Sequence, residues 1–331
     1  MRLARAHGCA IGACLLLLVA GAARANPEPP ALDVEETAPG VFVHMGKLLP
    51  LDAPGHDDIA NIGFVVGSRC IAVIDTGGSP RIGRALRAAV KKHSSLPICY
   101  VIDTHVHVDH VLGNIAFKDD KPEFVGHAAL AEAINRSRSY FLEHYAGDFD
   151  APPNANQIVA PDKLVATTLE LDLGGRRLEL RAWPKAHTDC DLTVLVQDAG
   201  VLWSGDLLFR ERVPALDGSA KGWLAAIDEL ARTKVKIIVP GHGPIARDSA
   251  SAWLPERKYL QTLIDGGGLT LTDVPCSCPA RTIGTKKCNW GRKCGILAVN
   301  GKNVGEVLIN EGLARQYLCK KTKCPPTQPW P

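Results

Sequence analysis

Between Val41 and Ile264, short apolar segments alternate with longer segments in which apolar residues recur at helical spacing. The short segments are rich in Val, Ile and Leu and predict strands, whereas the longer ones predict amphipathic helices. Many strands with interspersed helices indicate a layered α/β body whose helices cover the faces of sheets. The predicted strands span 41–45, 62–66, 70–75, 98–103, 169–173, 177–183, 192–197, 201–204 and 235–239, and the predicted helices span about 80–93, 128–145, 220–233 and 250–264.

Two further segments interrupt this pattern. Residues 149–161 are rich in Pro and Asn and predict a loop or lid beside whatever the body binds. Asp265 is followed by three glycines, a flexible composition that predicts a boundary between two bodies. We therefore expect a large domain over residues 31–265 and a small module over residues 266–331.

The N-terminal residues 1–25 have the pattern of a secretory signal peptide. Arg2 and Arg5 precede an apolar stretch over residues 9–22, and Ala23-Arg24-Ala25 forms a cleavage site of small residues. The apolar stretch is shorter than the roughly 20 residues that a membrane-spanning helix needs. We therefore expect a periplasmic or secreted protein that has no membrane anchor.

Charge is divided unevenly along the chain. Of the 331 residues, 46% are hydrophobic and 22% are charged, a composition that excludes a disordered chain. The net charge is +3, but residues 266–331 contain ten Lys and Arg against three Asp and Glu, so the larger body is negative. Two bodies of opposite charge therefore share one chain.

The cysteines agree with export, because six of them lie in the basic module and predict up to three disulfides of undetermined pairing. A zinc knuckle is the alternative, which the tight spacing of Cys276 and Cys278 disfavours. Cys70 and Cys99 lie in predicted strands and are expected to be buried thiols. The six cysteines of the module are Cys276, Cys278, Cys288, Cys294, Cys319 and Cys324.

The segment His105-Val106-His107-Val108-Asp109-His110, directly after a predicted strand, is rich in metal-binding side chains. In an extended chain, alternate residues point to one side, so His105 and His107 can bind one cation and Asp109 lies next in that row. A chain that then turns can present Asp109 and His110 to a second cation. Metal binding satisfies polar groups whose burial would otherwise be costly.

Three further candidate ligands each follow a predicted strand. His187 comes after the strand that ends near Trp183, Asp206 lies in Ser204-Gly205-Asp206, and His242 lies in Pro240-Gly241-His242-Gly243. Loops at one edge of a sheet are where α/β proteins assemble sites from distant parts of the sequence. These three side chains are therefore expected to meet the His-x-His-x-Asp-His segment in one metal site.

This pattern resembles the metallo-β-lactamase superfamily over roughly residues 41–264. The resemblance implies a four-layer αββα sandwich with two zinc ions at the edge of the sheets. Asp206 would bridge both ions, Asp75 would support the site without binding a metal, and the other histidines would be surface or packing residues. The implied ligands are His105, His107 and His187 for the first ion and Asp109, His110 and His242 for the second.

The bridging Asp206 is informative, because the commonest subclass of zinc β-lactamases has Cys there, which makes β-lactamase activity less expected. Cys190 lies outside that position and is expected to be a packing thiol. The segments 187–189, 203–209 and 217–224 resemble quinoprotein relay system zinc metallohydrolases. That resemblance implies export and association with a quinoprotein dehydrogenase, and it names no substrate.

The expected reaction is hydrolysis of a small-molecule ester, thioester, lactone or related substrate. Hydroxide held between two zinc ions would be the nucleophile, and Asp109 would orient it and act as the catalytic carboxylate. Two alternatives stay open. The same ligands can hold iron or mixed metals in a redox enzyme, and the protein can act mainly as the metal-containing escort of a quinoprotein dehydrogenase.

Residues 289–317 of the basic module resemble the C-terminal half of a staphylococcal-nuclease-like (thermonuclease) domain. The resemblance places Arg292 on a catalytic arginine and residues 304–314 on a helix. The upstream strands that carry the nuclease's acidic residues have no counterpart. An accessory module is therefore expected rather than an active nuclease, although the positive charge leaves nucleic acid open as a partner.

Overall fold

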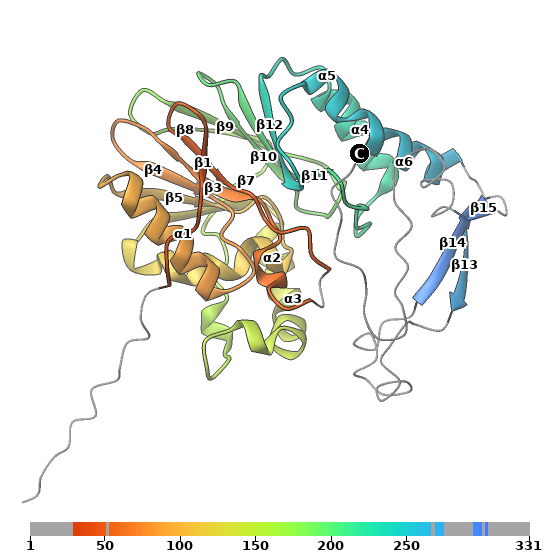
Figure 1. The fold of residues 1–331 in the computed structure, drawn as a ribbon, viewed down its shortest axis with the longest axis horizontal. Coiled ribbons are helices and arrows are strands. Elements are labelled where there is room, and N and C mark those ends of the chain that lie inside the picture. The colour runs from red at the N-terminus through yellow and green to blue at the C-terminus, as the bar shows by residue number, and fades with distance from the viewer. Residues whose placement is uncertain (1–28, 51–52, 266–268, 275–293, 300–301, 304–331) are drawn as a thin grey trace, which may run out of the picture.

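The computed structural model describes residues 29–50, 53–265, 269–274, 294–299 and 302–303. Two β-sheets face each other in the body, and helices cover the outer face of each sheet (Figure 1). The predicted signal peptide, the tail residue Arg292, the helix expected at 304–314 and five of the six tail cysteines lie outside the described residues.

The first sheet has seven strands, which lie in the order in which they occur along the chain. Neighbours from β1 to β4 pair antiparallel, whereas neighbours from β4 to β7 pair in parallel. The parallel half brings the carboxyl ends of β4, β5 and β6 to one edge of the sheet. The strands are β1 (Glu35–Ala38), β2 (Val41–His44), β3 (Ile62–Val66), β4 (Ile71–Ile74), β5 (Ile98–Ile102), β6 (Glu123–His127) and β7 (Lys163–Val165).

The second sheet has five strands in the order β12-β11-β10-β9-β8. All neighbours pair antiparallel except β11 and β12, which pair in parallel. This parallel pair places the carboxyl ends of β11 and β12 side by side. The strands are β8 (Thr168–Asp172), β9 (Arg177–Ala182), β10 (Leu192–Val196), β11 (Val201–Phe209) and β12 (Ile237–His242).

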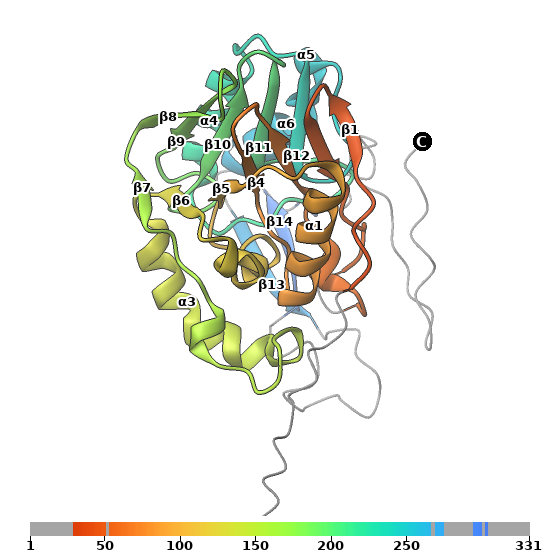
Figure 2. The ribbon, with the colours of Figure 1, turned by 90° about the vertical axis from the view of Figure 1, so that its left-hand side faces the viewer.

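The helices divide between the two outer faces, and Figure 2 views the molecule from the side that carries α1 and α3. Those of the N-terminal half are α1 (Pro80–His93), α2 (Val108–Val111) and α3 (Leu130–His144), and those of the C-terminal half are α4 (Ala220–Leu230), α5 (Ser249–Ala252) and α6 (Leu254–Asp265). Short 3-10 helices lie at His56–Asp58, Leu112–Asp120, Ala146–Asp148 and Ala155–Gln157.

Apolar side chains fill the three spaces between these layers. Val43, Leu180 and Trp203 belong to the cluster between the sheets. A second cluster joins the first sheet to α1, and a third joins the second sheet to α4 and α6. Each sheet therefore buries both of its faces, and the predicted αββα sandwich is confirmed.

Most predicted elements are present with shifted ends, and the helix predicted at 80–93 has the observed bounds of α1. Ser79 caps it by accepting a hydrogen bond from the Ile82 amide at 3.1 Å. The helix predicted at 250–264 is instead two helices, α5 and α6, because Pro255 has no amide proton to continue a helix from the preceding turn. The short strands β1, β6 and β7 were not predicted.

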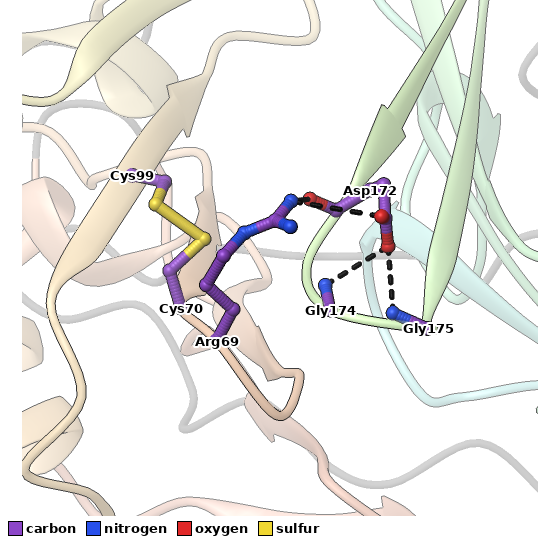
Figure 3. The surroundings of a disulfide bond; sticks show 6 residues. All are labelled: Arg69, Cys70, Cys99, Asp172, Gly174 and Gly175. Atoms are coloured by element: carbon purple, nitrogen blue, oxygen red, sulfur yellow. Dashed lines mark hydrogen bonds and ion pairs between the residues drawn. A yellow bond between two sulfur atoms is a disulfide. The ribbon is translucent and has the colours of Figure 1, made fainter.

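Cys70 and Cys99 form a disulfide, so the expectation of two buried thiols is wrong (Figure 3). Cys70 directly precedes β4 and Cys99 lies in β5. Because these strands pair in parallel, the two Cα atoms lie 5.8 Å apart, which is within the range for a disulfide. Apolar strand patterns gave no sign of this pairing, since it depends on which strands are neighbours in the sheet.

Beyond the body, three short strands form a separate antiparallel sheet. They are β13 (Leu269–Val274), β14 (Cys294–Val299) and β15 (Lys302–Asn303). The likeness of this region to a nuclease stays a prediction, because Arg292 lies outside the described residues. Within the described parts of the chain, no helix has the length and apolar character to cross a membrane.

Candidate metal centre

The first four candidate ligands lie just beyond the carboxyl end of β5. His105 and His107 belong to the connection that follows the strand, and α2 begins at Val108. The chain therefore turns before Asp109, as expected for the arrangement in which Asp109 and His110 serve a second cation. One turn of helix carries both Asp109 and His110, so these two side chains point to a different place from His105 and His107.

Three imidazole nitrogens and one carboxylate oxygen form the first cluster. His107 Nδ1 lies 3.1 Å from His105 Nε2 and 3.0 Å from His187 Nε2. Asp206 Oδ2 lies 3.6 Å from His105 Nε2 and 3.4 Å from His187 Nε2. Tetrahedral ligands about 2.0–2.2 Å from one zinc ion would lie roughly 3.3–3.6 Å from each other, which is close to this spacing.

The second cluster contains Asp109, His110 and His242. Asp109 Oδ2 lies 3.4 Å from His242 Nε2 and 3.8 Å from His110 Nε2. The Asp206 carboxylate also reaches this cluster, with Oδ1 3.2 Å from His110 Nε2 and Oδ2 3.3 Å from His242 Nε2. Asp206 thus contacts both clusters, in the place expected of a bridging ligand.

Hydrogen bonds behind the clusters set which imidazole nitrogen carries a proton. His187 Nδ1 donates to the carbonyl oxygen of Ala215 at 3.0 Å, and His242 Nδ1 donates to that of Ile59 at 2.8 Å. Because a neutral imidazole has one N–H, each Nε2 then faces its cluster as an unprotonated acceptor. This arrangement is typical of histidines that bind a metal ion.

His107 is turned the other way round. Its Nε2 lies 3.2 Å from Asp217 Oδ2 and donates to it, so the Nδ1 atom faces the first cluster. The hydrogen bond to Asp217 raises the pKa of His107 against the lowering effect of burial. Asp217 lies in the segment before α4. This distant segment therefore contacts the His105–His110 segment through His107.

Asp75 holds the segment after β5 in place. Its carboxylate accepts hydrogen bonds from the Thr104 amide and hydroxyl, both at 2.8 Å, and from His110 Nδ1 at 2.8 Å. The hydroxyl of Thr104 in turn accepts from His105 Nδ1 at 3.0 Å. Asp75 therefore orients imidazoles of both clusters, as the supporting role predicted for it requires.

Some buried polar atoms of these clusters have no partner among the described residues. His110 Nε2 and Asp206 Oδ1 are buried and have no hydrogen-bond partner of suitable geometry. Burial also lowers the pKa of His187 to about 3 and the pKa of His105 well below its ordinary value, so both imidazoles are neutral at pH 7. A cation would satisfy the unpaired atoms and needs imidazoles in this neutral form, so the residues fit a metal.

A comparison with known families decides the assignment of the fold. The family model described as the metallo-beta-lactamase superfamily matches residues 55–242, a span that contains all seven candidate ligands. The chain belongs to the metallo-beta-lactamase superfamily. Members are in general metal-dependent hydrolases, and this chain is accordingly an enzyme of that class.

Several solved structures have a similar fold. A metallo-beta-lactamase from Pontibacter korlensis superposes with a TM-score of 0.57 at 23% identity, over 70% of this chain and 99% of that one. For TMB-1 the TM-score is 0.56 at 19% identity, over 71% and 100%. For a variant of the sec-alkyl sulfatase PisA1 it is 0.55 at 17% identity, over 70% and 42%. At these identities the likeness concerns the fold alone.

In this superfamily member a cavity of about 490 Å³ opens above the two clusters. The Pro/Asn-rich segment 149–161 is a loop with one short 3-10 helix, as the prediction of a loop or lid allows, but none of its residues lines the cavity. The walls come instead from α3 and from the segment after β11. The lining residues are Val106, His107, Val108, Asp109, Ser137, Tyr140, Phe141, Tyr145, Asp206, Phe209, Arg212, Val213, Ala215, Asp217 and His242.

Several other predicted residues lie outside the two clusters. Cys190 is a free, buried thiol that packs near α3, and burial raises its pKa to about 12, in agreement with a packing role. His44 and His56 form ion pairs with Asp58 and Asp148 and belong to neither cluster. Sequence reasoning missed the roles of Thr104 and Asp217, because a single polar residue in a loop has no distinctive spacing.

Proposed function

We propose that the protein is an exported hydrolase that binds two divalent cations, preferably zinc, through the seven clustered side chains. The observation that carries this proposal is the position of Asp206, whose two carboxylate oxygens lie within 3.2–3.6 Å of four imidazole nitrogens from both clusters. One carboxylate placed between two sets of imidazole nitrogens is what a pair of adjacent ions requires.

When bound, two such cations polarise a substrate oxygen and bring the pKa of a bound water to about 7. The chain's own residues supply the rest of the chemistry. Asp109 lines the cavity, and its Oδ2 atom is placed to orient the attacking water and to accept its proton. Histidines held by Asp75, Ala215 and Ile59 keep their ring orientation through the reaction, because their outer nitrogens are fixed.

The walls of the cavity favour a small organic substrate. Tyr140, Phe141, Tyr145 and Phe209 give it an aromatic lining beside the polar floor, which suits an apolar group next to a hydrolysable bond. We propose an ester, thioester, lactone or related substrate. The segments 203–209 and 217–224, on β11 and around the start of α4, support membership of the quinoprotein relay type and a quinoprotein dehydrogenase as partner.

Export is supported by the Cys70–Cys99 disulfide as well as by the signal pattern at residues 1–25. Disulfides form and persist in oxidising compartments such as the periplasm and are rare in the cytosol. In a host that exports it, the mature chain is expected to begin at Asn26 and to be recovered from the periplasm or the medium. Mass measurement of the recovered protein tests this directly.

Metal quantification on the purified protein, together with a panel of ester, thioester, lactone and β-lactam substrates, tests the proposed function. We expect two equivalents of zinc per chain, a colourless protein, and turnover that the His105→Ala, His107→Ala double variant lacks. The exposed His93→Gln variant, which leaves both clusters intact, serves as the control. Stoichiometric iron with visible absorption would indicate the redox alternative, and absence of bound metal would contradict the site.

A further inference from the structure

The pairing of β11 with β12 is irregular at the place where β11 carries Asp206. Gly205 pairs with Pro240, and Phe209 pairs with His242. Between these two pairs β11 has three residues, whereas β12 has one. Extra residues in one strand form a β-bulge, which takes backbone groups out of the ladder and redirects side chains. The position of Asp206 therefore depends on what holds this bulge in place.

Side chains from two covering helices bond to the backbone of the bulge. Trp223 of α4 donates from Nε1 to the carbonyl oxygen of Leu207 at 3.1 Å. Glu256 of α6 accepts a hydrogen bond from the Phe209 amide through Oε2 at 2.9 Å. The outer helices therefore hold the segment that directly follows Asp206.

Stability alone does not explain a carboxyl group at Glu256. The side chain is buried, and its Oε1 atom has no hydrogen-bond partner among the described residues. Burial raises the pKa of Glu256 well above its ordinary value against the opposing effect of the Phe209 amide, and the charge of Asp206 adds to the rise. A buried polar group with an unsatisfied atom is costly for a fold. Its presence beside the bulge therefore indicates a role in the site.

Aromatic rings connect the bulge and its support to both clusters. Phe209 stacks on His242 of the second cluster, with ring centroids 5.0 Å apart and planes inclined by 21°. Trp223 makes an edge contact with His187 of the first cluster, with centroids 4.9 Å apart. Movement of the bulge or of its support would therefore shift one imidazole of each cluster as well as Asp206.

We propose that Glu256 and Trp223 are positioning residues that hold the end of β11 so that the Asp206 carboxylate lies between the two clusters. Both act through the backbone that follows Asp206 rather than by touching an ion or a substrate. The segments 203–209 and 217–224, which carry the finer family resemblance, are joined by one of these hydrogen bonds. The inference rests on the proposed function, because it takes Asp206 as a ligand of both ions.

Three substitutions separate the hydrogen bonds from the packing. Glu256→Leu removes the acceptor, Trp223→Phe keeps an aromatic ring and removes the donor, and Glu256→Gln keeps a neutral acceptor. We expect Glu256→Leu and Trp223→Phe to lower the affinity for zinc about 10- to 100-fold, as loss of a supporting group does. Glu256→Gln should stay within about threefold of the native protein, because the hydrogen bond is retained. Competition between the purified protein and a chromogenic chelator measures these affinities.

A matched control is needed, because a defect in the helical layer can weaken zinc binding simply by destabilising the fold. Leu263→Ala truncates a buried residue on the same helix and leaves both hydrogen bonds in place. It should lower the thermal midpoint of the metal-free protein without lowering zinc affinity, provided that affinities are measured below the unfolding transition. Cobalt in place of zinc has a visible spectrum that depends on ligand geometry, which Glu256→Leu should change and Leu263→Ala should not.

The outcomes differ for the two proposals. Weaker zinc binding in Glu256→Leu and Trp223→Phe, but not in Leu263→Ala, would support the positioning role whether or not any ester is hydrolysed. Equal affinity for zinc in these three variants would overturn the positioning role and leave the hydrolase proposal standing. A native protein that binds no zinc would contradict both proposals.

Discussion

At the scale of single residues, Asp206 depends on the absence of a side chain at Gly241. A Cβ atom at Gly241 would overlap Asp206 Oδ1 and approach the Gly205 backbone, which leaves the carboxylate no room in its present position. The parallel pairing of β11 with β12 brings these residues together. The glycine in the Pro240-Gly241-His242-Gly243 segment thus serves the neighbouring strand rather than its own turn.

Replacing Gly241 with Ala should therefore displace Asp206 from both clusters. We expect at least a tenfold loss of affinity for the ions, on the order of what loss of a supporting group causes. Competition with a chromogenic chelator measures this affinity. Gly147→Ala is the matched control, because a Cβ atom there has no neighbour within 4 Å. Equal affinity in the two variants would show that the Asp206 position is not required.

At the scale of elements, the sequence predicted the strands that carry the site but not the geometry of the chain between them. Strand β5 and helix α1 follow from plain apolar spacing and capping. Strand β11 was predicted to end at Ser204 because Gly205 and Asp206 break the apolar run, yet it continues to Phe209 with every residue buried. Imidazoles from other segments surround the Asp206 carboxylate of this buried strand, and the local sequence pattern does not show contacts between distant segments.

The same limit applies to α2 and to the disulfide. A helix of four residues is too short to have a periodic pattern, so the sequence predicted a turn near Asp109 but not the helix that makes it. The structure nevertheless brings the seven side chains together, as predicted. Histidines and aspartates that follow strands indicate a common site even when the exact geometry of the loops is unknown. Metal binding by these residues stays a prediction.

The ion pair between β2 and the 3-10 helix at His56–Asp58 gives a pH dependence of stability. His44 Nε2 lies 2.7 Å from Asp58 Oδ1. Burial lowers the pKa of His44, but the Asp58 and Asp33 hydrogen bonds outweigh it and raise that pKa overall. Burial raises the pKa of Asp58, but His44 and Lys47 outweigh it and lower that pKa overall.

The directions of these two pKa shifts determine how stability changes with pH. Because the His44 pKa is raised, protonated His44 stabilises the fold below about pH 6.5, and this stability is lost as the pH rises through the folded-state pKa. Because the Asp58 pKa is lowered, ionised Asp58 stabilises the fold above about pH 4, and this stability is lost on acidification. A double-mutant cycle with His44→Ala and Asp58→Ala should give a coupling of about 1 kcal/mol at pH 5.5, falling toward zero at pH 9. Urea unfolding of the four proteins measures this coupling free energy. A coupling that grows with pH would contradict an ion pair between His44 and Asp58.

At the scale of the whole molecule, each half of the sandwich supplies part of the site. The first half provides Asp75 and the ligands from His105 to His110, and the second half provides His187, Asp206 and His242. Each cluster contains residues from both halves. Bound ions would therefore connect the two sheets as well as serve catalysis.

Removing the ions should accordingly destabilise the entire body. With free metal at about 1,000 times its dissociation constant, binding contributes roughly 4 kcal/mol to folding. Treatment with a chelator should lower the thermal midpoint of the native protein, and re-addition of zinc should restore it. Asp206→Ala should show a low midpoint that responds little to either treatment. If the chelator left the thermal midpoint of the native protein unchanged, the ions would not stabilise the fold.

Because both halves supply ligands to each cluster, the fold affects which metal is bound. Neither half alone assembles either cluster, so ions are held only after the halves have met, that is, after folding. A chain exported unfolded would acquire its ions at its destination. Since histidine and carboxylate ligands accept several divalent metals, the supply outside the cytoplasm would then decide which one the enzyme carries.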